Sequence, residues 1–151
     1  MGKIVYSYYC LDIIYAGHLL QMKNAKRLAG KDGISIIGIL TDEAVMEKKP
    51  RPIIPFDERM IISEAIGYAD LVVPQETYSP IPNVLKMRPD ILMESASHSD
   101  ELLEQSRKTM RELGGKVIVT PYYPTQSSTT IKEKIKNAET KIINNIVESD
   151  K

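Results

Sequence analysis

The chain has 151 residues, with 20 lysines and arginines against 20 aspartates and glutamates, so its formal net charge is zero. This length suits one domain, and the charge balance disfavours nucleic acid as a partner because duplex binders carry a basic face. The single cysteine, Cys10, excludes an intramolecular disulfide and a cysteine-based metal site. Since no apolar run matches a membrane span and residues 1–9 lack the core of a signal peptide, we expect a cytoplasmic protein without membrane contact.

The first half of the chain alternates β-rich runs with amphipathic stretches. Lys3–Tyr8 is rich in Ile, Val and Tyr and predicts a strand, and the apolar spacing of Gly17–Ala29 then predicts a helix. Ile34–Leu40 is a nearly unbroken apolar run, as expected of a strand covered on both faces. A helix is predicted over Phe56–Tyr68, with Pro55 placed at its start.

The second half continues the alternation. Strands are predicted at Leu71–Pro74, Asp90–Met93 and Lys116–Thr120. Between them, Pro80–Met87 predicts a short helix, and Asp100–Leu113 predicts a longer one that Gly114 and Gly115 end.

The last predicted helix is Ser128–Val147, with an Ile-rich stripe along one face. We expect residues 1–147 to form the domain and residues 148–151 to be a polar tail. Strict alternation of strands and helices predicts the α/β class: a single Rossmann-like domain with a doubly wound, five-stranded parallel sheet. Ligands of such sheets bind beyond the carboxyl ends of the strands. The loops at that edge are residues 9–16, 41–55, 75–80, 94–99 and 121–127.

The loop after the first strand leads into a helix at Gly17 and His18. A helix start offers unpaired backbone N–H groups and partial positive charge, which attract phosphate. Gly17 permits close approach of a ligand, and His18 is suited to donate to a phosphate oxygen in a transition state. Asp12 either caps this helix or binds a ligand. On its own this pattern is weak, because a histidine at a helix start is more often a surface or capping residue.

Cations gather in the loop before the next helix, where Lys48, Lys49 and Arg59 are candidates to bind phosphates. The alternative is a solvated loop, with Arg59 in an ion pair on its helix surface. Ser127, Ser128 and Thr129 open the last helix. They cap it, form a second phosphate-binding helix start, or do both.

Residues 9–18, Tyr9-Cys10-Leu11-Asp12-Ile13-Ile14-Tyr15-Ala16-Gly17-His18, resemble the signature of the cytidylyltransferase-like nucleotidyltransferases: Gly-Thr-Phe-Asp, about two apolar residues, then His-x-Gly-His. The segment departs from it at Tyr9, Leu11 and Tyr15, the last of which replaces the first histidine. Other segments similar to the family follow in its order: Leu40-Thr41-Asp42-Glu43, Lys48-Lys49-Pro50-Arg51-Pro52, Pro55-Phe56-Asp57-Glu58-Arg59, Ala69-Asp70-Leu71-Val72-Val73, Arg88-Pro89-Asp90-Ile91-Leu92 and Gln126-Ser127-Ser128-Thr129-Thr130-Ile131-Lys132.

The resemblance implies transfer of CMP or AMP from the triphosphate to a phosphorylated polyol, sugar or amino-alcohol, with release of pyrophosphate. It also implies Mg²⁺ with the triphosphate, no metal held by the protein alone, and a homodimer. The implied catalytic residues are His18, Tyr15, Arg59 and Lys48. The implied nucleotide-binding residues are Tyr9, Cys10, Leu11, Asp12, Gly17, His18, Lys49, Arg59, Ser127, Ser128 and Thr129. The implied substrate-binding residues are Asp42, Glu94, His98 and Tyr122.

Several alternatives remain open at this point. The segment Arg51–Ile61 resembles the adenylyltransferase half of the ADP-heptose synthases of lipopolysaccharide-core assembly, whereas the size resembles glycerol-3-phosphate cytidylyltransferases. The changed loop Met93–His98 and the pair Tyr122-Tyr123, which stands where relatives have Arg-Thr, indicate an unusual substrate. Together with Tyr15 they also fit a nucleotide-binding module without transfer activity. A pantetheine-phosphate adenylyltransferase is a third interpretation.

Overall fold

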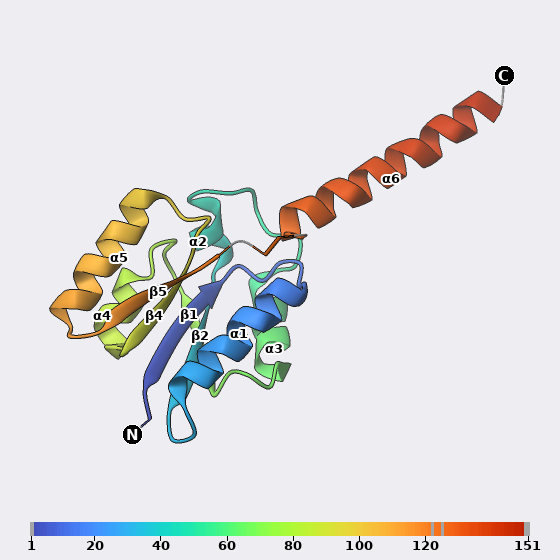
Figure 1. The fold of residues 1–151 in the computed structure, drawn as a ribbon. Coiled ribbons are helices and arrows are strands. Elements are labelled where there is room, and N and C mark those ends of the chain that lie inside the picture. The colour runs from blue at the N-terminus through green and yellow to red at the C-terminus, as the bar shows by residue number, and fades with distance from the viewer. Residues whose placement is uncertain (1, 122, 125, 150–151) are drawn as a thin grey trace.

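The computed structural model describes residues 2–121, 123–124 and 126–149, and these contain one sheet of five parallel strands with helices on both sides (Figure 1). The strands are β1 (Ile4–Tyr9), β2 (Ile34–Leu40), β3 (Leu71–Gln75), β4 (Ile91–Ser95) and β5 (Lys116–Thr120). Each agrees with a predicted strand to within a residue or two at its ends. The doubly wound parallel sheet predicted from the sequence is thus confirmed.

The strand order is β3-β2-β1-β4-β5. The chain builds outward from β1 to β3 and then crosses back to place β4 on the other side of β1. The direction of winding therefore reverses between β1 and β4. In open sheets of this kind the ligand crevice lies at that point, beyond the carboxyl ends of the strands.

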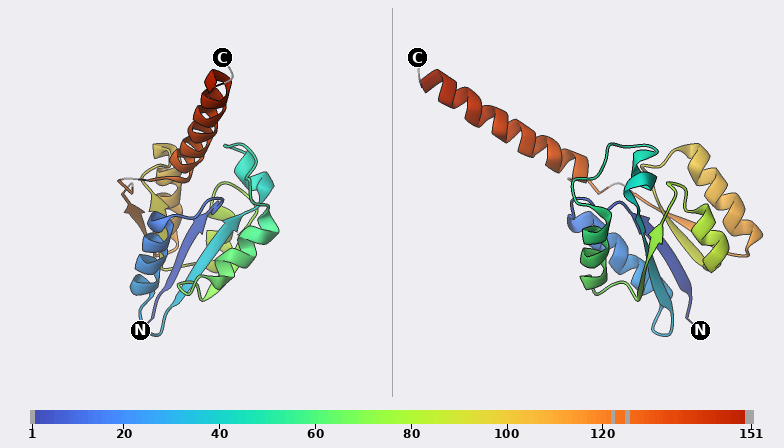
Figure 2. Two further views of the ribbon diagram at one scale, coloured as in Figure 1. Left: turned by 90° about the vertical axis from the view of Figure 1, so that its right-hand side faces the viewer. Right: turned by 180° about the vertical axis from the view of Figure 1, so that it is seen from behind.

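The helices form a layer on each face of the sheet (Figure 2). In chain order they are α1 (Ala16–Ala29), α2 (Asp42–Met46), α3 (Phe56–Ala65), α4 (Ile81–Met87), α5 (Asp100–Glu112) and α6 (Ser128–Ser149). Met22 of α1 and Met60 of α3 pack with Ile37 on one face, and Val84 of α4 and Met110 of α5 pack with Leu92 on the other. α2 is not predicted from the sequence, and α3 ends at Ala65, whereas the sequence pattern predicts a helix to Tyr68.

Alternation along β1 supplies both halves of the core. Tyr6 and Tyr8 face the α4 and α5 side, whereas Val5 and Tyr9 pack on the α1 side. The buried Tyr6 hydroxyl donates to Gln75 Oε1 at 2.6 Å, so its burial leaves no unpaired polar group. Gly38 on β2 makes room for this hydroxyl, because a Cβ there would lie 2.0 Å from it.

α6 differs from the other helices in its surroundings. It begins at the carboxyl edge of the sheet and runs away from the body (Figures 1 and 2). None of its 22 residues is buried. The helix includes Glu148 and Ser149, which the sequence analysis had assigned to a polar tail. Among the residues described here, no helix combines the length and apolar character that a membrane span requires.

Candidate functional site

The loop after β1 carries the backbone into the start of α1. Leu11 holds a left-handed conformation, with φ of 60°, which is uncommon for a residue other than glycine. Its side chain is buried in the core beside Tyr9 and Ile39, and this packing fixes the strained backbone. Tyr15 is the N-cap of α1, and no side-chain cap bond is formed there among the described residues. The His18 N–H donates to the Tyr15 carbonyl at 3.0 Å, whereas the N–H groups of Ala16 and Gly17 have no hydrogen-bond partner among the described residues and remain available at the carboxyl edge of the sheet.

His18 lies in the first turn of α1, as predicted. Its ring centroid is 4.3 Å from that of Tyr15 and 5.9 Å from that of Tyr9, which meets it edge-on. The Nδ1 atom is buried, and no described residue gives it a hydrogen-bond partner. Burial, aided by the charge of Lys49, lowers the pKa of His18 to about 4. The imidazole is therefore neutral near pH 7 and acts there as a hydrogen-bonding group, not as a cation.

Gly17 is needed for the close packing of this corner. A Cβ at this position would lie 2.4 Å from the Tyr15 ring and 2.9 Å from Cγ of Tyr123. Two open hollows adjoin the corner. One, of about 300 Å³, is lined by Ala16, Leu19, Leu20, Lys23, Tyr68 and Tyr123. The other, of about 360 Å³, is lined by Tyr15, Ala16, Tyr123, Gln126 and Lys134.

Asp12 has a role that the sequence analysis did not foresee. Its buried carboxylate accepts the N–H groups of Ile53 at 3.0 Å and Ile54 at 2.8 Å, and it pairs with Lys132 of α6. Asp12 therefore neither caps α1 nor faces a ligand; it joins three segments of the chain. Burial raises the pKa of this carboxyl group, but the Ile54 N–H, Lys132 and the Ile53 N–H outweigh burial and hold the pKa below its usual value.

Arg59 is another correction. Its side chain is fully buried, and its guanidinium donates to the carbonyl oxygens of Ile54, Cys10 and Leu40 at 2.7–2.9 Å and to Asp42 Oδ1 at 2.7 Å. Four of the five N–H donors of Arg59 therefore have protein acceptors, and this arrangement argues against the expected binding of phosphate by its side chain. Asp42, expected to bind substrate, is occupied by this pair and lies 3.7 Å from Arg51.

The remaining loop residues divide by exposure. Lys48 and Lys49 are exposed, and Lys49 is near enough to His18 to affect its titration. The side chains of Tyr9 and Leu11 are buried and that of Cys10 is partly buried, so contact with a nucleotide through this segment is left mainly to its backbone. Burial raises the pKa of the Cys10 thiol, which favours the unreactive protonated form.

Side chains at the start of α6 both cap the helix and bind it to the loop after β1. Ser127 Oγ accepts the Thr130 N–H at 3.0 Å, and Thr130 Oγ1 accepts the Ser127 N–H at 2.8 Å, which is a reciprocal cap. Ser128 Oγ donates to the carbonyl of Ile13 at 2.7 Å and so ties α6 to the loop after β1. Thr129 is exposed. The capping interpretation of Ser127 is confirmed, and phosphate binding by this segment stays a prediction.

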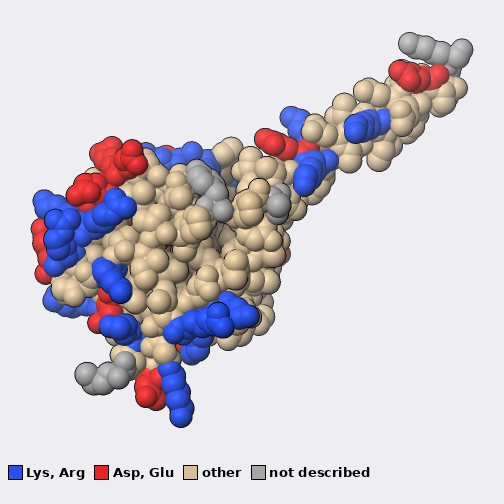
Figure 3. Space-filling model, in the orientation of Figure 1, with Lys and Arg blue, Asp and Glu red and all other residues tan. Residues whose placement is uncertain are grey.

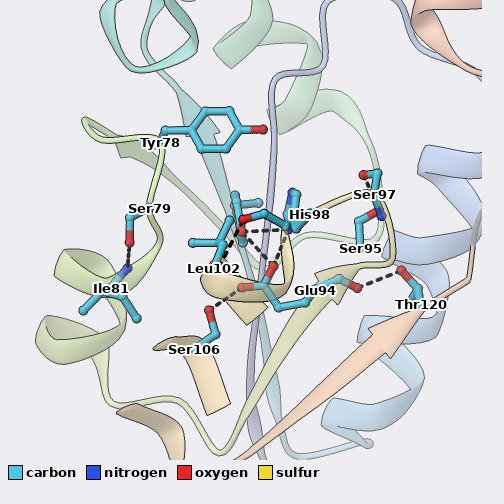
Figure 4. A network of polar contacts seen from close by, with 12 residues as sticks. Tyr78, Ser79, Ile81, Glu94, Ser95, Ser97, His98, Leu102, Ser106 and Thr120 are labelled. Atoms are coloured by element: carbon cyan, nitrogen blue, oxygen red, sulfur yellow. Dashed lines mark hydrogen bonds and ion pairs between the residues drawn. The ribbon is translucent and has the colours of Figure 1, made fainter. Parts of the chain in front are cut away.

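Glu94, the next-to-last residue of β4, lies in a buried polar network (Figure 4). Ser106 Oγ donates to Oε1 at 2.7 Å and the Tyr8 hydroxyl donates to Oε2 at 2.7 Å. His98 Nδ1 lies 2.5 Å from the same Oε2, and the His98 ring stacks on Tyr8 at 5.5 Å. Glu94 is fully buried, so it does not reach the surface where direct contact with substrate was expected. The partly exposed end of this network is His98, and its contact with substrate stays a prediction. Tyr122, the other substrate candidate, lies outside the described residues.

Three contributors were missed by the sequence analysis as site residues. Lys132 pairs with Asp12, Ser106 donates to Glu94, and Tyr78 lies edge-on to His98 with ring centroids 6.3 Å apart. Only Lys132 had a signal, because it ends the Thr-Thr-Ile-Lys segment that resembles the family. Within the described part of the chain, no cluster of three or more His, Cys, Asp or Glu side chains is placed to hold a metal ion.

The chain is similar in sequence to one segment of longer bacterial proteins. The chain is 31% identical over 137 residues to "Bifunctional protein HldE" of Photorhabdus laumondii and 30% identical over 135 residues to that of Magnetococcus marinus. These alignments cover 89% and 88% of this chain but only 28% and 27% of the relatives, so the chain spans about a quarter of their length.

Two solved structures share the fold. A lipopolysaccharide core biosynthesis protein of Thermoplasma volcanium superposes with a TM-score of 0.68 at 17% identity, covering 83% of this chain and all of that one. A protein of unknown function from Archaeoglobus fulgidus gives 0.59 at 19% identity, covering 80% and 99%. The family model described as cytidylyltransferase-like matches residues 10–134. From the signature loop to the start of α6, the chain belongs to the cytidylyltransferase-like family.

Proposed function

We propose that the chain is a nucleotidyltransferase that transfers CMP or AMP from the triphosphate to a phosphorylated small molecule and releases pyrophosphate. The observation that carries the proposal is the start of α1 at the crevice. Its N–H groups lack a side-chain cap, and the buried Nδ1 of His18 has no partner among the described residues. A helix start of this kind attracts phosphate, and an unpaired buried donor or acceptor calls for a ligand.

In the proposed reaction, an oxygen of the acceptor phosphate attacks the α-phosphorus of the nucleotide. The bond from the α-phosphorus to the bridging oxygen breaks, and pyrophosphate leaves with the electron pair. The attacking group is already an anion, so no general base is required. The α1 N–H groups and the neutral His18 donate to the α-phosphate as charge builds on it, and Lys48 and Lys49 attract the leaving phosphates. Bound with the triphosphate, Mg²⁺ would supply further neutralisation of the phosphate charge.

We place the acceptor between the ends of β1 and β4, where His98 is held by Glu94. A phosphorylated polyol, sugar or amino-alcohol fits this proposal, with a phosphorylated sugar of cell-envelope synthesis suggested by the resemblance of Arg51–Ile61 to the heptose branch. Tyr15 stands close to His18 and retains a hydroxyl that donates without carrying positive charge.

The test is pyrophosphate release by the purified chain with Mg²⁺, scanned over CTP, ATP, GTP and UTP against phosphorylated polyols, sugars and amino-alcohols. Release with one nucleotide and one acceptor supports the proposal and identifies both substrates. His18→Asn is expected to reduce turnover by about 100-fold or more, in line with loss of a transition-state donor. Lys31→Gln, in an exposed turn at the opposite end of α1, is the matched control and keeps full turnover.

A second candidate function rests on Tyr15. Its ring lies between His18 and Tyr123, with centroid distances of 4.3 and 5.7 Å, where the family signature has a histidine. This packing favours a nucleotide-binding module without transfer activity. Calorimetric binding of one nucleotide, with no pyrophosphate release from any pair, would establish the module and reject the enzyme.

A further inference from the structure

α6 is a long helix that contacts the described body of the chain only through its first turns. Its first turns are fixed by Ser128 to Ile13 and by Lys132 to Asp12, and the rest extends away from the body (Figures 1 and 2). Isolated helices in water are marginal, and helices in proteins gain most of their stability from packing an apolar face. The free part of α6 therefore calls for a surface to pack against.

The apolar face of α6 is continuous. Ile131, Ile135, Ala138, Ile142 and Ile146 recur every three or four residues and so lie along one side. The exposed fractions of Ile135, Ile142 and Ile146 are 61%, 60% and 57%. In the space-filling view, uncharged surface dominates the projecting helix (Figure 3). An apolar strip that continues along the part of the helix that extends away from the body marks an interaction site.

A second apolar surface lies on the outer side of α1. Leu19 and Leu20 are exposed there, beside the hollow of about 300 Å³ that Tyr68 and Tyr123 complete. The α6 of the same chain starts at this corner and runs away from α1, so it does not cover the hollow. Each chain thus exposes both an apolar helix and an apolar surface that its own helix leaves open.

We propose that α6 of one copy packs along α1 of a second copy, in a reciprocal dimer. The lengths match: α6 extends roughly 26 Å beyond Lys132, and α1 is about 21 Å long. One pair of opposite charges is available between the two surfaces, because Glu139 lies within the apolar face of α6 and Lys23 lines the α1 surface. A two-fold axis repeats the same contact twice, which closes the assembly.

The first experiment measures the mass of the full chain in solution by sedimentation equilibrium over the micromolar range, without substrates. A dimer is expected. Ile142→Glu with Ile146→Glu puts charge on the apolar face and should weaken dimerisation by about 100-fold or more. Asn137→Glu with Asn144→Glu adds the same charge on the opposite side of α6 and should leave the dimer intact. Circular dichroism and melting of each variant show whether the body stays folded.

The second experiment tests which surfaces meet. Lys23→Glu and Glu139→Lys should each weaken self-association by about tenfold, since each places like charges together. An equimolar mixture of the two variants should recover dimers, because each contact then joins opposite charges. The proposal is overturned if the unmodified chain stays monomeric, if the apolar-face variant still dimerises, if the mixture fails to recover, or if α6 instead binds lipid vesicles.

Discussion

Lys132, in the second turn of α6, pairs with the buried carboxylate of Asp12, which lies 120 residues earlier in the chain. The same carboxylate accepts the N–H groups of Ile53 and Ile54. One side chain thus connects the loop after β1, the segment that leads into α3, and the base of α6. These are three of the segments that surround the proposed nucleotide site.

Asp12→Asn should therefore destabilise the protein although it preserves the shape of the side chain. The amide keeps one oxygen for two N–H donors and loses the charge opposite Lys132. The expected loss is about 1–3 kcal/mol in the free energy of unfolding, measured with urea, together with faster hydrogen exchange of the Ile53 and Ile54 amides. Asp32→Asn, in an exposed turn, is the control and should change stability by less than about 0.5 kcal/mol.

The pH dependence of Asp12 has a definite sign. Because its folded pKa lies below its unfolded value, Asp12 contributes stability that is full above the unfolded pKa and is lost as pH falls through the folded pKa. The contribution begins to decline as pH falls below the unfolded carboxyl pKa, which is about 4, and is lost once pH is below the folded pKa. Identical acid limbs of the stability profile for the unmodified chain and Asp12→Asn would contradict this assignment.

Arg59→Met should cost about 3–5 kcal/mol, because it leaves Asp42 unpaired and three carbonyl oxygens without their donor. The readout is urea unfolding. Arg51→Met removes a cation from the other side of the same carboxylate, but Arg51 is exposed and its pair is long, at 3.7 Å. It should cost under about 1 kcal/mol. Equal losses in the two variants would contradict the role of Arg59 as an internal brace.

Glu94→Gln should disturb the network at the end of β4. The amide nitrogen would meet a donor from Ser106 on one side or from Tyr8 and His98 on the other, so one hydrogen bond is lost. We expect a loss of about 1–3 kcal/mol in unfolding free energy. In the proposed enzyme, KM for the acceptor should rise while KM for the nucleotide stays constant. Glu104→Gln, an exposed residue of α5, should change none of these values.

Much of the fold was accessible from sequence because its signals are local. β2 and most of β4 are short apolar runs with buried side chains on both faces, so β2 was placed to the residue and β4 to within two residues. α2 has five residues, too few to show a helical period, and it depends on a cap bond from Ala44 N–H to Thr41 Oγ1. α3 ends early because Ile66 turns to an extended backbone, a change that its apolar side chain does not announce.

The candidate site was also predictable only where the signal is local in the sequence. The sequence placed Gly17 and His18 in the first turn of a helix at the crevice, and the structure confirms that position. It did not show that Arg59 is internal, because the carbonyls of Cys10 and Leu40 come from distant segments that only the fold brings together. It predicted an apolar face on the last helix but carried no information about what covers it.

His18 should make the free energy of unfolding depend on pH in a range above that of the carboxyl groups. Its folded pKa of about 4 is below the unfolded value near 6.5, so the unfolded state binds the proton first. Stability should therefore fall as pH decreases from about 6.5 to about 4, by up to roughly 3 kcal/mol. His18→Asn should remove this slope. An imidazole NMR titration that places the pKa of His18 above 6 would contradict the prediction.

Gly17→Ala tests the packing of the corner without adding a polar group. The new methyl group would lie 2.4 Å from the Tyr15 ring, so the ring must move away from His18. Alanine is a better helix former than glycine, which offsets about 1 kcal/mol of the strain. We therefore expect a modest change in stability, a raised pKa for His18 as its cover opens, and a loss of nucleotide affinity measured by calorimetry. Gly67→Ala, where a Cβ meets nothing within 4 Å, is the control. If Gly17→Ala keeps both the His18 titration and the nucleotide affinity of the unmodified chain, the close contact between Tyr15 and His18 has no part in binding.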